Sequence, residues 1–282
     1  MIRFHLSVSS LVLFLCVQGG CSKRVVSLGP PPASLGLSPF YQKYVSAGGI
    51  PVIASTDVPD EALLMARDIM GHMLAHRPDV RDRIIHSNIR VAVMSQREVT
   101  TDIPEHRDLA PKAYWDKRAR GLGATAARPA TSCAEENLLG YPDDPYRGEN
   151  ILIHEFGHTI HEFGLRTLDP SFDDRLKSAF NESLRRELWS HTYAATNVNE
   201  YWAEGVQSWF DANLSADPPD GIHNRVCTRE GIQQYDPGLA RLLADSFPHE
   251  EWRWTRNGSH AHSRERANAT ATTSRGTAVA AK

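Results

Sequence analysis

Residues 151–161 read ILIHEFGHTIH, and this stretch decides the fold of the chain. Its apolar residues and lack of proline predict a buried helix, capped by Asn150 or Gly148 and ended by Gly164. At its centre, His154 to His158 have the form H-E-x-x-H. Positions four apart share one face of a helix, so the two histidines can bind one metal ion. An ordinary core helix with hydrogen-bonded histidines is the alternative.

Zinc is the metal that this motif indicates, with Glu155 placed to take a proton from a metal-bound water. A catalytic zinc ion usually has three protein ligands and a water. His161 shares the ligand face, but a rise of about 1.5 Å per residue puts it too far from His154 to share one ion. We expect His161 to line the pocket or to hydrogen-bond a metal ligand without touching the metal. An ordinary hydrogen-bonded core histidine is an equally good interpretation.

A second predicted helix supplies a third ligand. Residues 199–210 read NEYWAEGVQSWF, with apolar residues at helical spacing. Glu200 and Glu204 share one face, and an acidic pair on an apolar helix is costly unless it is paired or binds metal. We therefore expect Glu200 to complete the site and Glu204 to hydrogen-bond the far nitrogen of a ligand histidine. Two exposed glutamates on an amphipathic helix are the alternative.

These motifs resemble the catalytic domain of anthrax lethal factor and its relatives, which are gluzincin zinc metalloendopeptidases. The resemblance rests on HEFGH and on EYWAE at 200–204, and it covers about residues 150–210. It implies that His154, His158 and Glu200 bind zinc. It also implies that Tyr193, seven residues before Glu200, helps to stabilise an oxyanion, although Tyr193 also fits simple core packing. No counterpart of the other lethal factor domains is present, so toxin delivery and kinase-kinase substrates are not implied.

The expected fold is α+β: a zincin-like metallopeptidase domain with a small mixed sheet, an active-site helix and a mostly helical C-terminal lobe. Apolar runs predict strands at 49–54 and 89–94, the second of them central, and helices at 59–74, 173–189 and 237–247. The helix at 173–189 is expected to cover the zinc helix. Residues 97–118 and 216–236 are expected to be irregular. From its position in gluzincins, segment 120–132 is expected to be the sheet edge that holds an extended peptide.

Residues 1–22 are typical of a secretion signal, because a short positive start precedes an apolar core too short to span a membrane. Gly20-Cys21 also fits a bacterial lipoprotein site, with Cys21 acylated as a lipid anchor. Residues 23–38 are expected to be a linker and 39–255 the catalytic domain. Residues 256–282 lack apolar periodicity, which predicts a disordered tail. The chain is therefore expected to be secreted or extracellular, with no membrane span.

Two of the four cysteines, Cys133 and Cys227, belong to the predicted domain. In an oxidising compartment they are expected to form a disulfide. The alternative is that Cys133 supplies an inhibitory thiolate to zinc. Sequons begin at four asparagines, and in a eukaryotic source some of them could carry glycans: Asn181, Asn213, Asn257 and Asn268.

A net charge of −3 and a pI of about 6.5 give no indication of nucleic acid or an anionic membrane as partner. We expect a secreted metalloendopeptidase with one Zn²⁺ ion, acting on a peptide or protein substrate with Glu155 as general base. A non-enzymatic extracellular zincin-fold protein that keeps zinc for stability is the main alternative, and a zinc hydrolase acting on a non-peptide amide is another. Glu155 favours an enzyme, because a structural site needs no base. No pattern indicates an oligomeric state.

Overall fold

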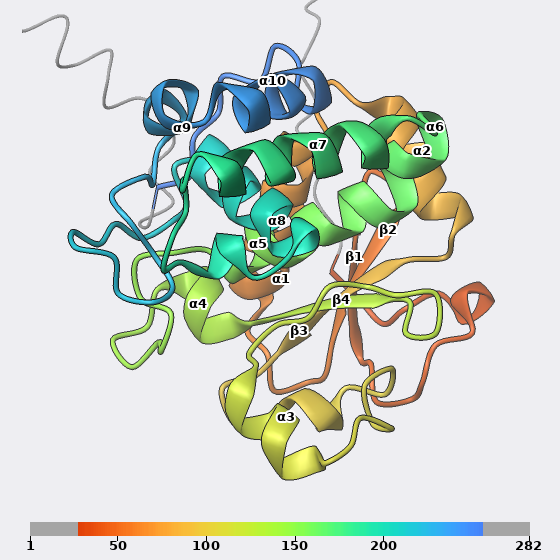
Figure 1. The fold of residues 1–282 in the computed structure, drawn as a ribbon. Helices are drawn as coiled ribbons and strands as arrows, with labels where there is room; N and C mark the ends of the chain where they lie inside the picture. The colour runs from red at the N-terminus through yellow and green to blue at the C-terminus, as the bar shows by residue number, and fades with distance from the viewer. Residues whose placement is uncertain (1–27, 256–282) are drawn as a thin grey trace, which may run out of the picture.

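A small mixed sheet lies beside a larger group of helices in the computed structural model, which describes residues 28–255 (Figure 1). In order across the sheet, the strands are β1 (Lys43–Ala47), β2 (Ile50–Ala54), β3 (Arg90–Met94) and β4 (Ala130–Ala134). β1 and β2 are antiparallel, whereas β2 with β3 and β3 with β4 are parallel. The expected α+β class with a small mixed sheet is confirmed, with β3 in its interior.

Several expectations fall outside the described residues: the signal peptide at 1–22, acylation of Cys21, the tail at 256–282 and the sequons at Asn257 and Asn268. The described part of the expected linker packs on the domain. Gly29 pairs with Tyr44 of β1, and Leu28 contacts the main core. None of the helices in residues 28–255 has the length and apolar character needed to cross a bilayer.

The two interior strands, β2 and β3, are buried on both faces, which explains why they are apolar runs rather than alternating patterns. Side chains of successive residues point to opposite faces of a strand. Val91 and Val93 therefore pack into the larger core, together with Cys133 of β4 and the main helices. Ala92 and Met94 pack into a smaller cluster on the other face. The helices of the C-terminal lobe lie on one side of the sheet in Figure 1.

From the end of β4 to residue 255 the chain is mostly helical, as expected for the C-terminal lobe. The α-helices are α1 (Asp60–Met73), α2 (Pro78–His86), α3 (Lys112–Arg118), α4 (Glu135–Leu139), α5 (Ile151–Thr159), α6 (Arg166–Leu168), α7 (Phe172–Arg185), α8 (Val198–Trp209), α9 (Arg229–Tyr235) and α10 (Pro237–Ser246). Short 3-10 turns are η1 (Ala33–Leu35), η2 (Thr100–Asp102) and η4 (Tyr193–Ala195), and η3 (Ile160–Leu165) is π-helical.

Two segments expected to be irregular contain helices. α3 lies within 97–118, and α9 lies within 216–236. Both are seven residues long, so neither contains enough turns to show a clear apolar period. α3 contributes directly to the site described below.

α5 carries the H-E-x-x-H motif between β4 on one side and α8 on the other. The Asn150 side chain caps its N-terminus, with Oδ1 accepting from Ile153 N–H at 3.0 Å, as predicted. Trp202 of α8 is fully buried, and its Nε1 donates to the Gly157 carbonyl at 2.9 Å. This bond links the two helices one residue before His158.

The helix does not end at Gly164, so that part of the prediction is wrong. It continues as the π-helical turn η3 and then α6. A Cβ at Gly164 would lie 2.5 Å from Val80 Cγ1 of α2. The glycine therefore permits close packing with α2 rather than a helix stop.

α7 was expected to cover the zinc helix, but it packs mainly on α8 and α10. Figure 1 shows it on the outer side of α8. The amphipathic pattern predicted a covering helix correctly, whereas its partner depends on chain path and cannot be read from periodicity.

The predicted Cys133–Cys227 disulfide is wrong, because both residues are free thiols. Cys133 is fully buried in the core beneath α5, whereas Cys227 lies beside Ser215 in the loop after α8. Burial raises the pKa of the Cys133 thiol far above its usual range. This position gives no support to a Cys133 thiolate on zinc.

Candidate metal centre

His154, His158 and Glu200 converge, and their ligand atoms all lie within 4.8 Å of one another. The two histidines come from successive turns of α5, and Glu200 comes from the first turn of α8. Glu200 Oε2 lies 3.1 Å from His154 Nε2 and 3.4 Å from His158 Nε2. The two Nε2 atoms are 3.2 Å apart. The spacing on α5 and the packing of α8 thus bring together the three ligands expected from sequence.

The α8 end of the site is positioned by its own cap. The Asn197 side chain accepts from the backbone N–H groups of Asn199 and Glu200 at 2.9 and 3.0 Å. An asparagine cap satisfies donors that the first helical turn leaves free. The Asn197 cap therefore fixes the start of α8, and Glu200 in the first turn faces His154 and His158.

The charges of His154 and Glu200 strongly shift each other's pKa. Burial alone would lower the pKa of His154, but its bond to Glu200 and the charges of Glu155 and Glu204 raise it to about 10. Burial would raise the pKa of Glu200, but its bonds to His154 and His158 lower it well below its usual range. Without metal, the pair is therefore an imidazolium and a carboxylate at neutral pH.

Glu155 lines a cavity of about 920 Å³ together with the three candidate ligand residues His154, His158 and Glu200. Gly121 packs against the Glu155 side chain in the cavity wall: a Cβ added to Gly121 would lie only 3.2 Å from Glu155 Cγ. Burial raises the pKa of Glu155, although the two histidines oppose the rise. A carboxylate with a raised pKa is a stronger base, which suits it to accept a proton.

Tyr193 lies at this cavity, as the sequence resemblance implied, and its ring centroid is 6.4 Å from that of His154. Its backbone N–H donates to the Ile222 carbonyl at 2.8 Å, which holds η4 in place. Burial and the nearby Glu200 charge raise the pKa of Tyr193 to about 12, against the effect of Arg118. The phenol is therefore protonated at neutral pH and has one hydrogen to donate.

Arg118 is a site residue that sequence reasoning missed. It ends α3, lines the cavity, and donates from Nη2 to the Tyr193 hydroxyl at 3.2 Å. Its guanidinium also lies 5.8 Å from the centre of the Trp115 ring. Its segment was expected to be irregular, so no pattern placed this cation near the motif.

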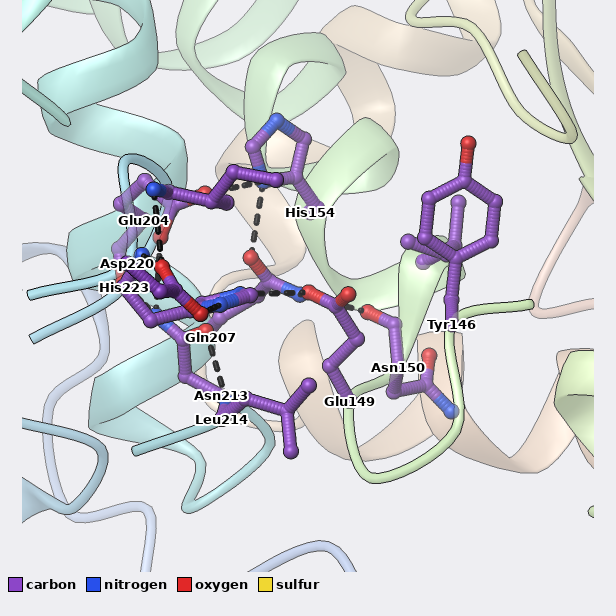
Figure 2. Close-up of polar contacts among 12 residues, drawn as sticks. Tyr146, Glu149, Asn150, His154, Glu204, Gln207, Asn213, Leu214, Asp220 and His223 are labelled. Atoms are coloured by element: carbon purple, nitrogen blue, oxygen red, sulfur yellow. Dashed lines mark hydrogen bonds and ion pairs between the residues drawn. The ribbon is translucent and has the colours of Figure 1, made fainter. Parts of the chain in front are cut away.

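Gln207 is the second residue that was missed. Its Oε1 lies 2.8 Å from His154 Nδ1, whereas Glu204 Oε1 is 3.5 Å from the same atom (Figure 2). Glu204 was expected to hold that nitrogen, but Gln207 makes the shorter contact. Gln207 lies seven residues after Glu200, and this helical spacing is the signal that could have indicated it.

The loop that follows α8 supplies further polar neighbours to Glu204 and to Glu149 (Figure 2). Asn213 Nδ2 donates to Glu204 Oε2 at 2.9 Å, and His223 Nε2 lies 3.5 Å from Glu149 Oε2.

Asn213 is buried, so its sequon is not open to a glycan in this fold. The Asn181 side chain is exposed on α7.

His161 lines the same cavity, but its Nε2 contacts Asp173 Oδ1 at 2.8 Å. Its ring lies 5.4 Å from that of Phe172 and 6.1 Å from that of Trp202. These distances place His161 in the cavity wall, with Asp173 as its own acidic partner.

Segment 120–132 includes the residues beside β4 that were expected to be the sheet edge, and residues 120–125 line the cavity. Binding of an extended peptide there stays a prediction. Leu122 pairs antiparallel with Ser132 of β4, and each backbone N–H of the pair donates to the other's carbonyl. The peptide groups of Gly121 and Gly123 alternate with those of Leu122 and so face away from β4. Both glycines line the cavity, and a Cβ at Gly123 would lie 3.0 Å from His158 Cβ.

No family model matches the chain, and no curated protein is similar to it at a significant level. Among solved structures, the chain is similar to the Pro-Pro endopeptidase PPEP-2 from Paenibacillus alvei. The identity is 16% and the TM-score 0.45, over 69% of this chain and 96% of that chain. At this identity and TM-score, the activity of that endopeptidase does not transfer to this chain.

Proposed function

We propose that this chain is a zinc-dependent peptidase that hydrolyses peptide bonds in the cavity beside α5. The observation that carries the proposal is the convergence of His154, His158 and Glu200 at a cavity that Glu155 also lines. A structural zinc site is usually closed by four protein ligands, whereas a catalytic site keeps one position open. Three protein donors beside a large cavity match the second kind.

The donor set fits zinc. Two imidazole nitrogens and one carboxylate oxygen are a usual catalytic zinc set, whereas magnesium and calcium prefer oxygen donors alone. His154 and Glu200 are held in contact by buried packing and by the Asn197 cap. When bound, zinc would act as a Lewis acid and lower the pKa of a water in the cavity.

The residues around this position have separate roles in the proposed reaction. Glu155 accepts a proton from the attacking water and then donates it to the leaving amine. Attack turns the peptide carbonyl oxygen into an oxyanion. Tyr193 donates its hydroxyl hydrogen to that oxyanion, because the Arg118 guanidinium has no acceptor and must itself be the donor in their contact.

The edge formed by Gly121 and Gly123 supports a peptide substrate. An extended peptide can add to it as a further strand and hydrogen-bond the two glycine peptide groups. The two glycines let this edge pack directly against α5, since a Cβ at Gly121 would lie 2.5 Å from Ile151 Cγ2 and a Cβ at Gly123 3.0 Å from His158 Cβ. A substrate held this way would lie in the cavity that Glu155 and the three candidate ligand residues also line.

Two finer points belong to the same proposal. Two histidines from H-E-x-x-H with a glutamate from a second helix form the gluzincin ligand pattern, and we propose that class. Secretion rests on residues 1–22 alone, which lie outside the described residues.

A peptide library, with and without a chelator, tests the function. We expect zinc-dependent cleavage by the wild type. Glu155→Gln should retain zinc, because Glu155 is not a ligand, and should lose turnover by several orders of magnitude. Ser246→Ala, which removes a buried hydrogen bond in α10 far along the chain, is the control and should cleave normally. Full activity of Glu155→Gln would rule out the mechanism, and no cleavage by a zinc-loaded wild type would favour a non-enzymatic zinc protein.

A further inference from the structure

We propose that Gln207 is the positioning residue of the metal centre: its amide oxygen holds His154 in the tautomer whose Nε2 faces the metal. The inference rests on the proposed zinc site and adds a residue with no assigned role. Gln207 is fully buried on α8, two turns after Glu200. A fully buried amide at this place must satisfy its hydrogen-bonding groups within the protein.

The orientation of the Gln207 amide follows from its neighbours. Its Nε2 lies 3.3 Å from Glu149 Oε2 and 3.3 Å from the Asn150 carbonyl oxygen. Both of these atoms are acceptors, so the NH₂ group has to face them. The amide oxygen is then left on the side of His154, where it lies 2.8 Å from Nδ1. A flipped amide would place oxygen against two acceptors, which excludes it.

The oxygen in turn decides the His154 tautomer. An amide oxygen can only accept, so Nδ1 must carry the hydrogen. In the neutral ring, Nε2 then has a free lone pair, and this is the atom beside Glu200 and His158. Gln207 therefore selects the form of His154 that can bind metal, through the nitrogen on the far side of the ring.

Glu204 is less suited to this role. Its Oε1 is 3.5 Å from Nδ1, longer than a good hydrogen bond, and its Oε2 accepts from Asn213 at 2.9 Å. A neutral amide also avoids a further buried negative charge close to Glu149 and Glu204. Because Gln207 and Glu200 belong to one helix, α8 holds the His154 ring at both nitrogens.

The zinc dissociation constant of the full chain tests the role. Gln207→Leu replaces the amide by an apolar side chain of similar size that has no hydrogen-bond acceptor. It should weaken zinc binding about 10- to 100-fold. Ser246→Ala should bind as the wild type does. The double variant Gln207→Glu with Glu149→Gln exchanges the amide and the carboxylate while keeping their number. It should recover most of the lost affinity, because position 207 again offers an acceptor to Nδ1.

A spectroscopic signature separates positioning from general packing. In zinc-loaded wild type and in the double variant, ¹⁵N NMR of the imidazoles should show a slowly exchanging Nδ1–H on His154. In Gln207→Leu that proton should exchange rapidly, even where zinc is added to saturation. A variant that only loosened the fold would lower the melting temperature without this selective change.

The inference is overturned if Gln207→Leu binds zinc as tightly as the wild type. It is also overturned if zinc affinity falls in Glu204→Gln but not in Gln207→Leu. If Gln207→Leu does not fold, the double variant decides, because unrecovered affinity in a folded double variant also overturns it. The readout is separate from hydrolysis. A wild type that binds zinc through this arrangement but cleaves no peptide refutes the proposed function and leaves the role of Gln207 intact.

Discussion

Arg118 Nη2 donates to the Tyr193 hydroxyl at 3.2 Å and so connects α3 to η4 across the cavity that both line. Because the guanidinium can only donate, the hydroxyl hydrogen of Tyr193 is directed to another acceptor, which in the metal-free protein is the Glu200 carboxylate. A raised pKa keeps that hydrogen in place at neutral pH. The pair is thus a preformed donor beside the proposed reaction centre.

Tyr193→Phe should lower kcat for peptide hydrolysis by about 10²–10³, the usual effect of removing one oxyanion donor. Zinc affinity should stay the same, because Tyr193 is not a ligand. Steady-state kinetics together with a zinc titration would check both statements. Unchanged kcat would show that the ring serves only to pack against His154.

Zinc binding should release about one proton at pH 7.5, because His154 is protonated in the metal-free protein and must lose that proton to bind metal. Apparent zinc affinity should therefore rise with pH up to about 10, where His154 titrates. Calorimetry in buffers of different ionisation enthalpy measures the proton count. Zinc uptake with no proton release would contradict the ion pair with Glu200.

The same pair predicts how the metal-free protein responds to pH. The folded pKa of His154 is raised from 6.5 to about 10, so folding binds the proton more tightly. Its stabilising contribution should be complete below about pH 6.5 and lost as pH rises through about 10. Chemical denaturation of chelated protein between pH 6 and 10 would test this, with His154→Gln as the control that lacks the trend.

Zinc should stabilise the folded chain. At a free zinc concentration about 100 times the dissociation constant, mass action contributes about 2.7 kcal/mol, which raises the melting temperature of a domain of this size by about 5–10 °C. Thermal unfolding with zinc and with a chelator measures the shift. Glu200→Gln should shrink it, and an equal shift in that variant would remove Glu200 from the ligand set.

Backbone pairing at Gly121 and Gly123 is best tested on the substrate. Substitution at these glycines would also disturb α5, since an added Cβ meets Ile151 or His158. N-methylation of a substrate amide that pairs with this edge should reduce kcat/KM about tenfold, the effect of losing one hydrogen bond of about 1.4 kcal/mol. Methylation at the neighbouring amide, which faces away, is the matched control. Equal tolerance at both positions would exclude strand addition.

Local pattern was sufficient for much of the fold. The strands at 50–54 and 90–94 and helices α1, α5, α8 and α10 follow from apolar runs and helical spacing. Short elements such as α3 were missed because seven residues show little periodicity. The disulfide was wrong because the pairing of two cysteines depends on where the fold carries each of them, and Cys133 is deep in the core.

The sequence by itself determined which atoms are placed to bind a metal ion. His154 and His158 share a face because a helix repeats every 3.6 residues, and this holds wherever the helix packs. Tertiary structure decided the rest: that Gln207 rather than Glu204 contacts His154 most closely, and that Arg118 reaches Tyr193. These contacts depend on the distance and angle between separate elements, which are set by buried packing such as Trp202 against α5 rather than by any local repeat.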